Sequence, residues 1–310
     1  MVMIRGLRAL PAAFCLLLGL ASAGVAGDGR QTLGFGRLFT NDALGDGKDR
    51  WRTGSYTVNW MRGRTPWTGR LPESLGDVLE YRFRAEIIAP ANLTSPDPAD
   101  RRYAGTLSFG IHSHAERGAT RFSLGADLVA TGPMTGLGGF QEFVHDLFGM
   151  PSPAAALANQ IPNAIHPTAT ASATREISVA GGAFHLMPFV EGQVGVETLV
   201  RAGADLRIGM AGTEGLWLRD VVTGQQYYAA AGAQGLSFTL GGDIAHVASS
   251  AYLPAGEPAV LEPTRTRLRA GLTWQGESST LFYGVTWLGK EFQGQAEGQV
   301  VGSLSLKFRF

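Results

Sequence analysis

The residues best suited to chemistry lie in one segment, TGPMTGLGGFQEFVHDLFG at positions 131–149. A Gly-Pro turn opens the segment, and apolar residues then recur at helical spacing, which predicts a short helix near residues 136–148. Gln141 and His145 are one helical turn apart and therefore share a face. A histidine there can be functional, or it can be a structural residue whose ring has one donor and one acceptor satisfied.

A second cluster occupies FTNDALGDGKDRWRTGSYTVNW near the start of the mature chain. Asn41 and Asp42 follow the first predicted strand, and Asp46, Asp49 and Arg50 lie in the loop that leads to the next one. Oxygen ligands clustered in this way can hold a hard cation such as calcium. The alternative is a hydrophilic extracellular loop without a ligand.

Two further stretches carry polar residues in a fixed order. Asp100, Arg101, Arg102 and Tyr103 precede a predicted strand, and NQIPN spans residues 159–163. Taken singly, the first is a turn entering a strand and the second is part of a loop over residues 150–167.

The elements that must position these residues are strands. The C-terminal GQVVGSLSLKFRF alternates apolar and polar side chains to its last residue, and LEYRFRAEI, TRTRLRAGLTW and the long run from Val190 to Ile208 do the same. Period two of this kind suits a soluble sandwich or barrel with a buried apolar face. It also suits a transmembrane barrel with lipid outside and a polar interior.

Three features favour the transmembrane barrel. Apolar residues often alternate with arginine and glutamate, which suits a hydrated lumen. Several strands are near or above the roughly ten residues that cross a bilayer at a tilt. Trp60, Trp274 and Trp287 lie near strand ends, where an interfacial girdle would place them. We therefore predict an all-β, antiparallel transmembrane barrel, with a soluble periplasmic β-protein as the alternative.

The first residues predict export. Residues 1–26 have the charged start, apolar middle and small-residue end of a signal peptide, with cleavage after Ala23 or Ala26 fitting equally well. Residues 27–310 then form one barrel domain. The only cysteine, Cys15, lies in the leader, so the mature chain has no disulfide framework.

Composition and motifs exclude several function classes. The 26 basic and 26 acidic residues balance, which gives no argument for nucleic acid as a partner. No HExxH, CxxC, GxSxG or phosphate-loop pattern occurs.

Taken together, the polar stretches resemble one family, the outer-membrane lipid A 3'-O-deacylases of the LpxR type. The matching order begins in the first hairpin and ends in the NQIPN loop, and its motifs occupy the N-terminal half of the chain. In sequence order the matching residues are Asn41, Asp42, Asp49, Arg50, Thr53, Asp100, Arg101, Tyr103, Ala104, Gly105, Gly132, Pro133, Gln141, His145, Gly149, Gln160 and Asn163.

The resemblance implies a barrel of about twelve strands in the outer membrane of a Gram-negative bacterium. It also implies a calcium-dependent esterase that removes the 3'-linked acyloxyacyl group of lipid A in lipopolysaccharide. By that resemblance His145 is the general base, and Gln141 orients His145 or the attacking water. Asn41 and Asp42 would be metal ligands that place the calcium ion against the ester carbonyl.

The resemblance further implies substrate-binding residues. Arg101 or Arg102 would bind a lipid A phosphate, and Thr53 would contribute to the same substrate site.

The chain also departs from the family pattern. An Asn-Glu pair of the family is Asn163-Ala164 here, and Asp146 is the sole carboxylate close after His145. A non-catalytic barrel, acting as a pore or a structural element, and a family member with an altered lipid substrate therefore stay open.

Overall fold

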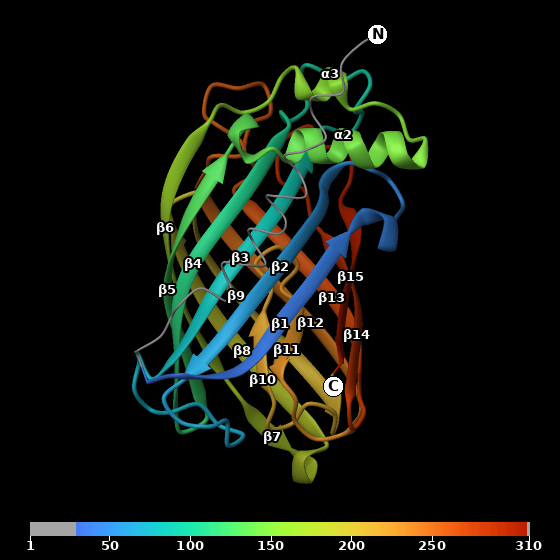
Figure 1. Cartoon of the computed structure of the whole chain (residues 1–310). Helices are drawn as coiled ribbons and strands as arrows, with labels where there is room; N and C mark the ends of the chain where they lie inside the picture. The colour runs from blue at the N-terminus through green and yellow to red at the C-terminus, as the bar shows by residue number, and fades with distance from the viewer. Residues whose placement is uncertain (1–28, 309–310) are drawn as a thin grey trace.

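Twelve antiparallel strands form the barrel wall within residues 29–308, which the computed structural model describes (Figure 1). Neighbouring wall strands follow chain order, and the sheet closes where β1 pairs with β15 and β6 pairs with β8. The predicted antiparallel barrel is confirmed. Its strands are β1 (Gln31–Asn41), β2 (Trp51–Gly63), β3 (Val78–Ala89), β4 (Ala104–Arg117), β5 (Thr120–Thr131), β6 (Ala164–Arg175), β8 (Phe184–Val194), β9 (Glu197–Gly209), β12 (Gly235–Ser250), β13 (Thr264–Gln275), β14 (Ser279–Leu288) and β15 (Gln299–Phe308).

The period-two pattern has its apolar side outward. On β13, Leu268 and Leu272 are 59% and 50% exposed, whereas Arg267 and Arg269, which flank Leu268, are each 4% exposed. An exposed apolar wall is stable in lipid, where a closed sheet also satisfies every backbone hydrogen bond.

Ion pairs fill much of the lumen. Glu291, on the loop before β15, accepts hydrogen bonds from the guanidinium groups of Arg52, Arg101 and Arg265. Farther along the lumen, Asp243 pairs with Arg267. These buried side chains stay ionised because each has an opposite charge within hydrogen-bonding distance.

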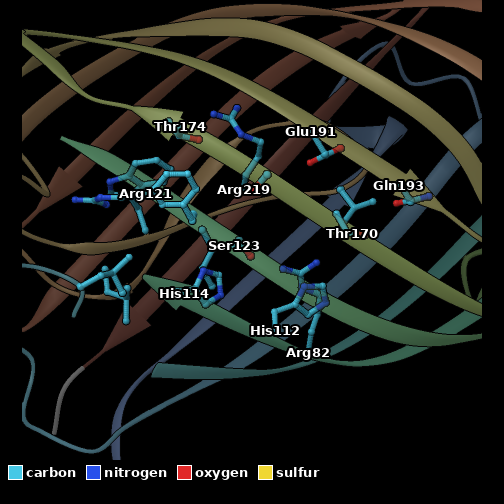
Figure 2. Close-up of a pocket in the computed structure, with 17 residues that line it drawn as sticks. Arg82, His112, His114, Arg121, Ser123, Thr170, Thr174, Glu191, Gln193 and Arg219 are labelled. Carbon is cyan, nitrogen blue, oxygen red and sulfur yellow. The ribbon is translucent and has the colours of Figure 1, made fainter. Parts of the chain in front are cut away.

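A small hairpin also lies inside the barrel. Strands β10 (Leu216–Arg219) and β11 (Gln226–Ala230) form a separate two-stranded sheet between β9 and β12. The Tyr227 hydroxyl donates to Asn59 Oδ1 of the wall at 2.5 Å, and Leu218 packs with Leu38 of β1 in a buried cluster. Between this hairpin and the wall lies a cavity of about 80 Å³, whose lining includes His112, His114 and Arg219 (Figure 2). The alternating pattern of the wall gave no indication of this hairpin.

The two ends of the barrel differ. At the end that carries the longest connection, 132–163, four of the other five connections have nine to fourteen residues, and the turn at 195–196 is the exception. At the opposite end the turns at 118–119 and 276–278 have two and three residues, and the 210–234 connection contains the β10–β11 hairpin. Outer-membrane barrels have short periplasmic turns and longer extracellular loops, so the end that carries residues 132–163 faces outward.

The long connection contains the predicted helix. Helix α2 (Leu137–Phe148) follows a 3-10 turn, η2 (Pro133–Thr135), and lies across the end of the barrel (Figure 1). The loop expected over residues 150–167 instead contains α3 (Ala154–Leu157) and the start of β6. No helix in residues 29–308 is long and apolar enough to span a bilayer.

The remaining elements are short. The 3-10 turn η1 (Asp42–Leu44) follows β1, and β7 (Ile177–Val179) with η3 (Ala180–Gly182) connects β6 to β8. The run from Val190 to Ile208, read as one alternating stretch, is divided between β8 and β9 by a turn at residues 195–196. The predicted leader, residues 1–26, lies outside the described residues.

Candidate functional site

A turn that requires glycine places the start of α2. Gly132 has φ +89°, and its N–H donates to the Gly105 carbonyl of β4 at 3.0 Å. A Cβ at Gly132 would lie 2.7 Å from the backbone nitrogen of Asn163, so only glycine fits. The Asn163 Oδ1 in turn accepts the Met134 N–H at 2.7 Å. The Gly-Pro turn and the end of the NQIPN motif therefore fix each other's position.

Tyr103 attaches the second half of this connection to the barrel. The residue is fully buried, and its carbonyl accepts the Ile161 N–H at 2.9 Å, beside a bridge between Tyr103 and Gln160. Two motifs that are weak when taken singly are thus backbone anchors of the helix-bearing segment.

The C-terminal end of α2 orients the His145 ring. Gly149, in the left-handed conformation, ends the helix and reverses the chain, so that the Pro151 carbonyl lies 2.6 Å from His145 Nδ1. A carbonyl oxygen can only accept, so Nδ1 carries a proton and the ring directs Nε2 elsewhere. The ring is 3% exposed.

His145 Nε2 faces a carboxylate from the first hairpin. Asp49 Oδ2 lies 3.0 Å from Nε2, and Asp49 Oδ1 accepts the Thr53 hydroxyl at 2.5 Å. Gln141 is one turn before His145 on the buried face, and its Nε2 is 3.5 Å from Asp49 Oδ1. The structure therefore brings together Gln141, His145 and Thr53 from the predicted site residues.

A β-bulge accompanies this arrangement. Trp51 pairs with Ala89 and Gly54 with Ile87, so residues 52 and 53 face a single residue of β3. Bulges bend a strand and redirect its side chains. Thr53 lies in the bulge, where its hydroxyl reaches back to Asp49 in the preceding loop.

Asp42 is buried next to this group. Its Oδ2 accepts the Arg50 N–H at 3.0 Å, and the Thr53 hydroxyl lies close to its side chain. Burial raises the pKa of Asp42 to about 7, and the charge of Asp49 contributes to the same increase. Asn41 precedes it, with Oδ1 accepting the Ala43 N–H at 2.8 Å as a cap of η1.

The donor chemistry suits a hard cation. Within residues 29–308, no three His, Cys, Asp or Glu side chains are grouped as a metal site. Calcium, however, also uses amide and carbonyl oxygens and water. Gln141 Oε1 is buried without a hydrogen-bond partner, and it lies on the same helix face that meets Asp49. Asp42, Asp49 and Gln141 therefore offer oxygen ligands, and a cation there would offset the burial that disfavours the charged form of Asp42.

The two predicted phosphate-binding arginines lie in another part of the outer end. Arg101 is 2% exposed and pairs with Glu291 in the lumen, whereas Arg102 donates to Glu257 Oε1 at 3.0 Å. Both line a cleft of about 130 Å³ between extracellular loops, which shares no lining residue with the His145 group. Their role in phosphate binding stays a prediction.

Two features of the site were not anticipated from the residues. Asp49 matched the family pattern but was not singled out as the partner of His145, although it lies in the same acidic loop as Asp42. Asp146, the carboxylate next to His145 in sequence, is exposed, and the Pro151 carbonyl holds the ring instead.

Comparisons with known proteins give the family and the fold. The family described as outer membrane protein LpxR matches residues 10–310. The solved structure of LpxR from Salmonella typhimurium is similar, with a TM-score of 0.75 at 17% identity, covering 89% of this chain and 99% of that one. The beta domain of the Bordetella autotransporter Brka gives a TM-score of 0.45 at 9% identity, covering 91% and 100% of the two chains. No curated protein sequence matches the chain.

Proposed function

The chain belongs to the LpxR family of outer membrane proteins, and from this we propose that it is a calcium-dependent esterase that removes the 3'-linked acyloxyacyl group from lipid A. One observation carries the proposal. At the outer end of a lipid-facing barrel, a buried histidine is held by a backbone carbonyl on one side and meets a carboxylate on the other.

His145 is the general base of the proposed reaction. With Nδ1 donating to the Pro151 carbonyl, Nε2 takes a proton from water while the water oxygen attacks the ester carbonyl carbon. The tetrahedral intermediate then collapses, the sugar oxygen leaves with the proton from Nε2, and the acyl group departs as a carboxylic acid.

Asp49 and Gln141 are positioning residues for this base. Asp49 places a negative charge next to the ring, which stabilises the imidazolium that forms when Nε2 takes the proton. Water must displace Asp49 Oδ2 from Nε2 before attack, and Asp49 keeps its hydrogen bond to Thr53 through Oδ1. The Gln141 amide is 3.4 Å from Nε2, close enough to orient the same water.

Asn41 and Asp42, with Asp49 and Gln141 Oε1, would hold the cation. A calcium ion held there would supply positive charge for polarising the ester carbonyl and stabilising the oxyanion. Arg101 and Arg102 remain the proposed residues for a lipid A phosphate, through the cleft that they line.

No observation favours the pore. Among the described residues, the lumen contains the β10–β11 hairpin and the ion pairs around Glu291, whereas a pore needs an open polar passage. An altered lipid substrate is an outcome that the experiment below distinguishes.

The test is the lipid A mass spectrum of cells that express the protein, with and without calcium. We expect loss of one 3'-linked acyloxyacyl unit, abolished in His145→Ala and retained in His246→Ala, because His246 is exposed on the outer wall. Loss of a different acyl group would indicate another lipid substrate. An unchanged spectrum together with ion conductance in planar bilayers would contradict the esterase and favour the pore.

A further inference from the structure

Helix α2 turns its apolar residues away from the protein. Phe140, Phe143, Leu147 and Phe148, here called the apolar face of α2, are 50%, 57%, 64% and 72% exposed. The residues of α2 that are buried against the barrel are Gly138, Gln141 and His145. An ordinary surface helix has the opposite arrangement, with its apolar stripe on the core.

The sides of α2 have three different environments. At about 100° per residue, the apolar face is centred roughly a third of a turn from the buried side. Glu142 and Asp146, both exposed, lie at a similar angle from the apolar face on its other side. A helix that packs on protein with one side and contacts lipid and water with the other two needs this division of side chains.

Helix α2 also lies at the end of a part of the wall whose outer surface is apolar. Helix α2 contacts β3 and β4, and the outer wall of this part of the barrel carries exposed Phe109 on β4 and Leu128 on β5. Met134 and Met150, just before and just after the helix, are 47% and 41% exposed. Exposed apolar surface of this extent marks an interaction site rather than a water-facing helix.

We propose that α2 is an interfacial helix whose apolar face inserts into the acyl-chain layer of the outer leaflet, as an extension of the lipid-facing wall. The buried side then holds Gln141 and His145 just inside the level at which the acyl chains begin. This inference rests on the barrel and the helix faces alone, so it holds whether or not the site is catalytic.

Single introduced cysteines test the insertion. Cys15, the one cysteine of the sequence, lies in the predicted leader, so an introduced cysteine would be the one site for labelling in the mature chain. Phe143→Cys and Leu147→Cys are compared with the matched controls Glu142→Cys and Asp146→Cys. Each carries an environment-sensitive fluorophore, in phosphatidylcholine vesicles with or without a doxyl spin label near the start of the acyl chain. Heat-modifiable migration on a gel verifies that each barrel is folded.

We expect blue-shifted emission and about twofold or greater extra quenching at positions 143 and 147 relative to 142 and 146. Equal quenching and water-like emission at all four positions would overturn the proposal. Blue-shifted emission at 143 and 147 without doxyl quenching would overturn it as well, since protein rather than lipid would then cover the face. The readout involves no hydrolysis, so its failure is separate from failure of the proposed esterase.

Discussion

Asp49→Asn is the sharpest test of the proposed site. The substitution preserves shape, and the new amide oxygen can still accept the Thr53 hydroxyl, but the negative charge next to His145 Nε2 is lost. Hydrogen bonds to charged groups contribute about 1.5–3 kcal/mol. Asp49 is 24% exposed at its side chain and His145 is 4% exposed, so solvent screens this pair only in part.

Asp49 stays next to the ring through its hydrogen bond to Thr53 after water displaces Oδ2, so its negative charge still acts on the imidazolium. If a charge interaction of that size is lost from the transition state, kcat falls about 10- to 100-fold, at roughly 1.4 kcal/mol for each factor of ten. The assay is the rate of acyl release from purified lipid A in detergent with calcium present, quantified by mass spectrometry. Asp146→Asn is the matched control, because it is the neighbouring aspartate, is exposed and makes no described contact with the ring. We expect it to change kcat less than about twofold, because surface substitutions away from buried or functional contacts have small effects.

Two results would refute the reasoning. Asp49→Asn with an unchanged rate would mean that the contact with His145 has no role in the reaction. A loss in Asp146→Asn as large as that in Asp49→Asn would mean that the wrong carboxylate has been assigned.

Three further outcomes are expected. Asp42→Asn should raise the calcium concentration that gives half-maximal hydrolysis after treatment with a chelator, whereas an unchanged calcium dependence would remove Asp42 from the cation site. Gly132→Ala should strain the turn by about 1–3 kcal/mol, because its φ is +89° and the Pro162 carbonyl lies 2.7 Å from the new Cβ. Activity should then fall while the barrel still migrates as a folded species on a gel, and full activity would contradict the role of this turn. Glu291→Gln should lower the free energy of unfolding in detergent by about 3–5 kcal/mol, because it leaves buried guanidinium groups without a full counter-charge. Glu257 has a half-exposed side chain, so Glu257→Gln should lower the free energy of unfolding by no more than about 1 kcal/mol. An equal loss of stability in the two variants would refute the argument from burial.

The sequence determined the wall of this protein. Period two held over stretches such as residues 264–275 requires a sheet with two unlike faces, and the arginines on one face favoured a lumen over a soluble surface. Helical spacing also determined α2, which the structure has at Leu137–Phe148. Both are local properties, because side-chain direction repeats every two residues in a strand and about every 3.6 in a helix.

Only the tertiary structure decided which parts meet. Asp49 and His145 are far apart in the chain, and their contact depends on barrel closure, on the bulge at residues 52–53 and on the turn at Gly132. The β10–β11 hairpin could not be predicted, since its short strands show no period that separates a lumen plug from a loop. The orientation of α2 was also undetermined, because an apolar stripe packs equally well on a protein core or on lipid. That choice depends on what surrounds the helix, and the barrel supplied a polar rim on one side and a lipid-facing wall on the other.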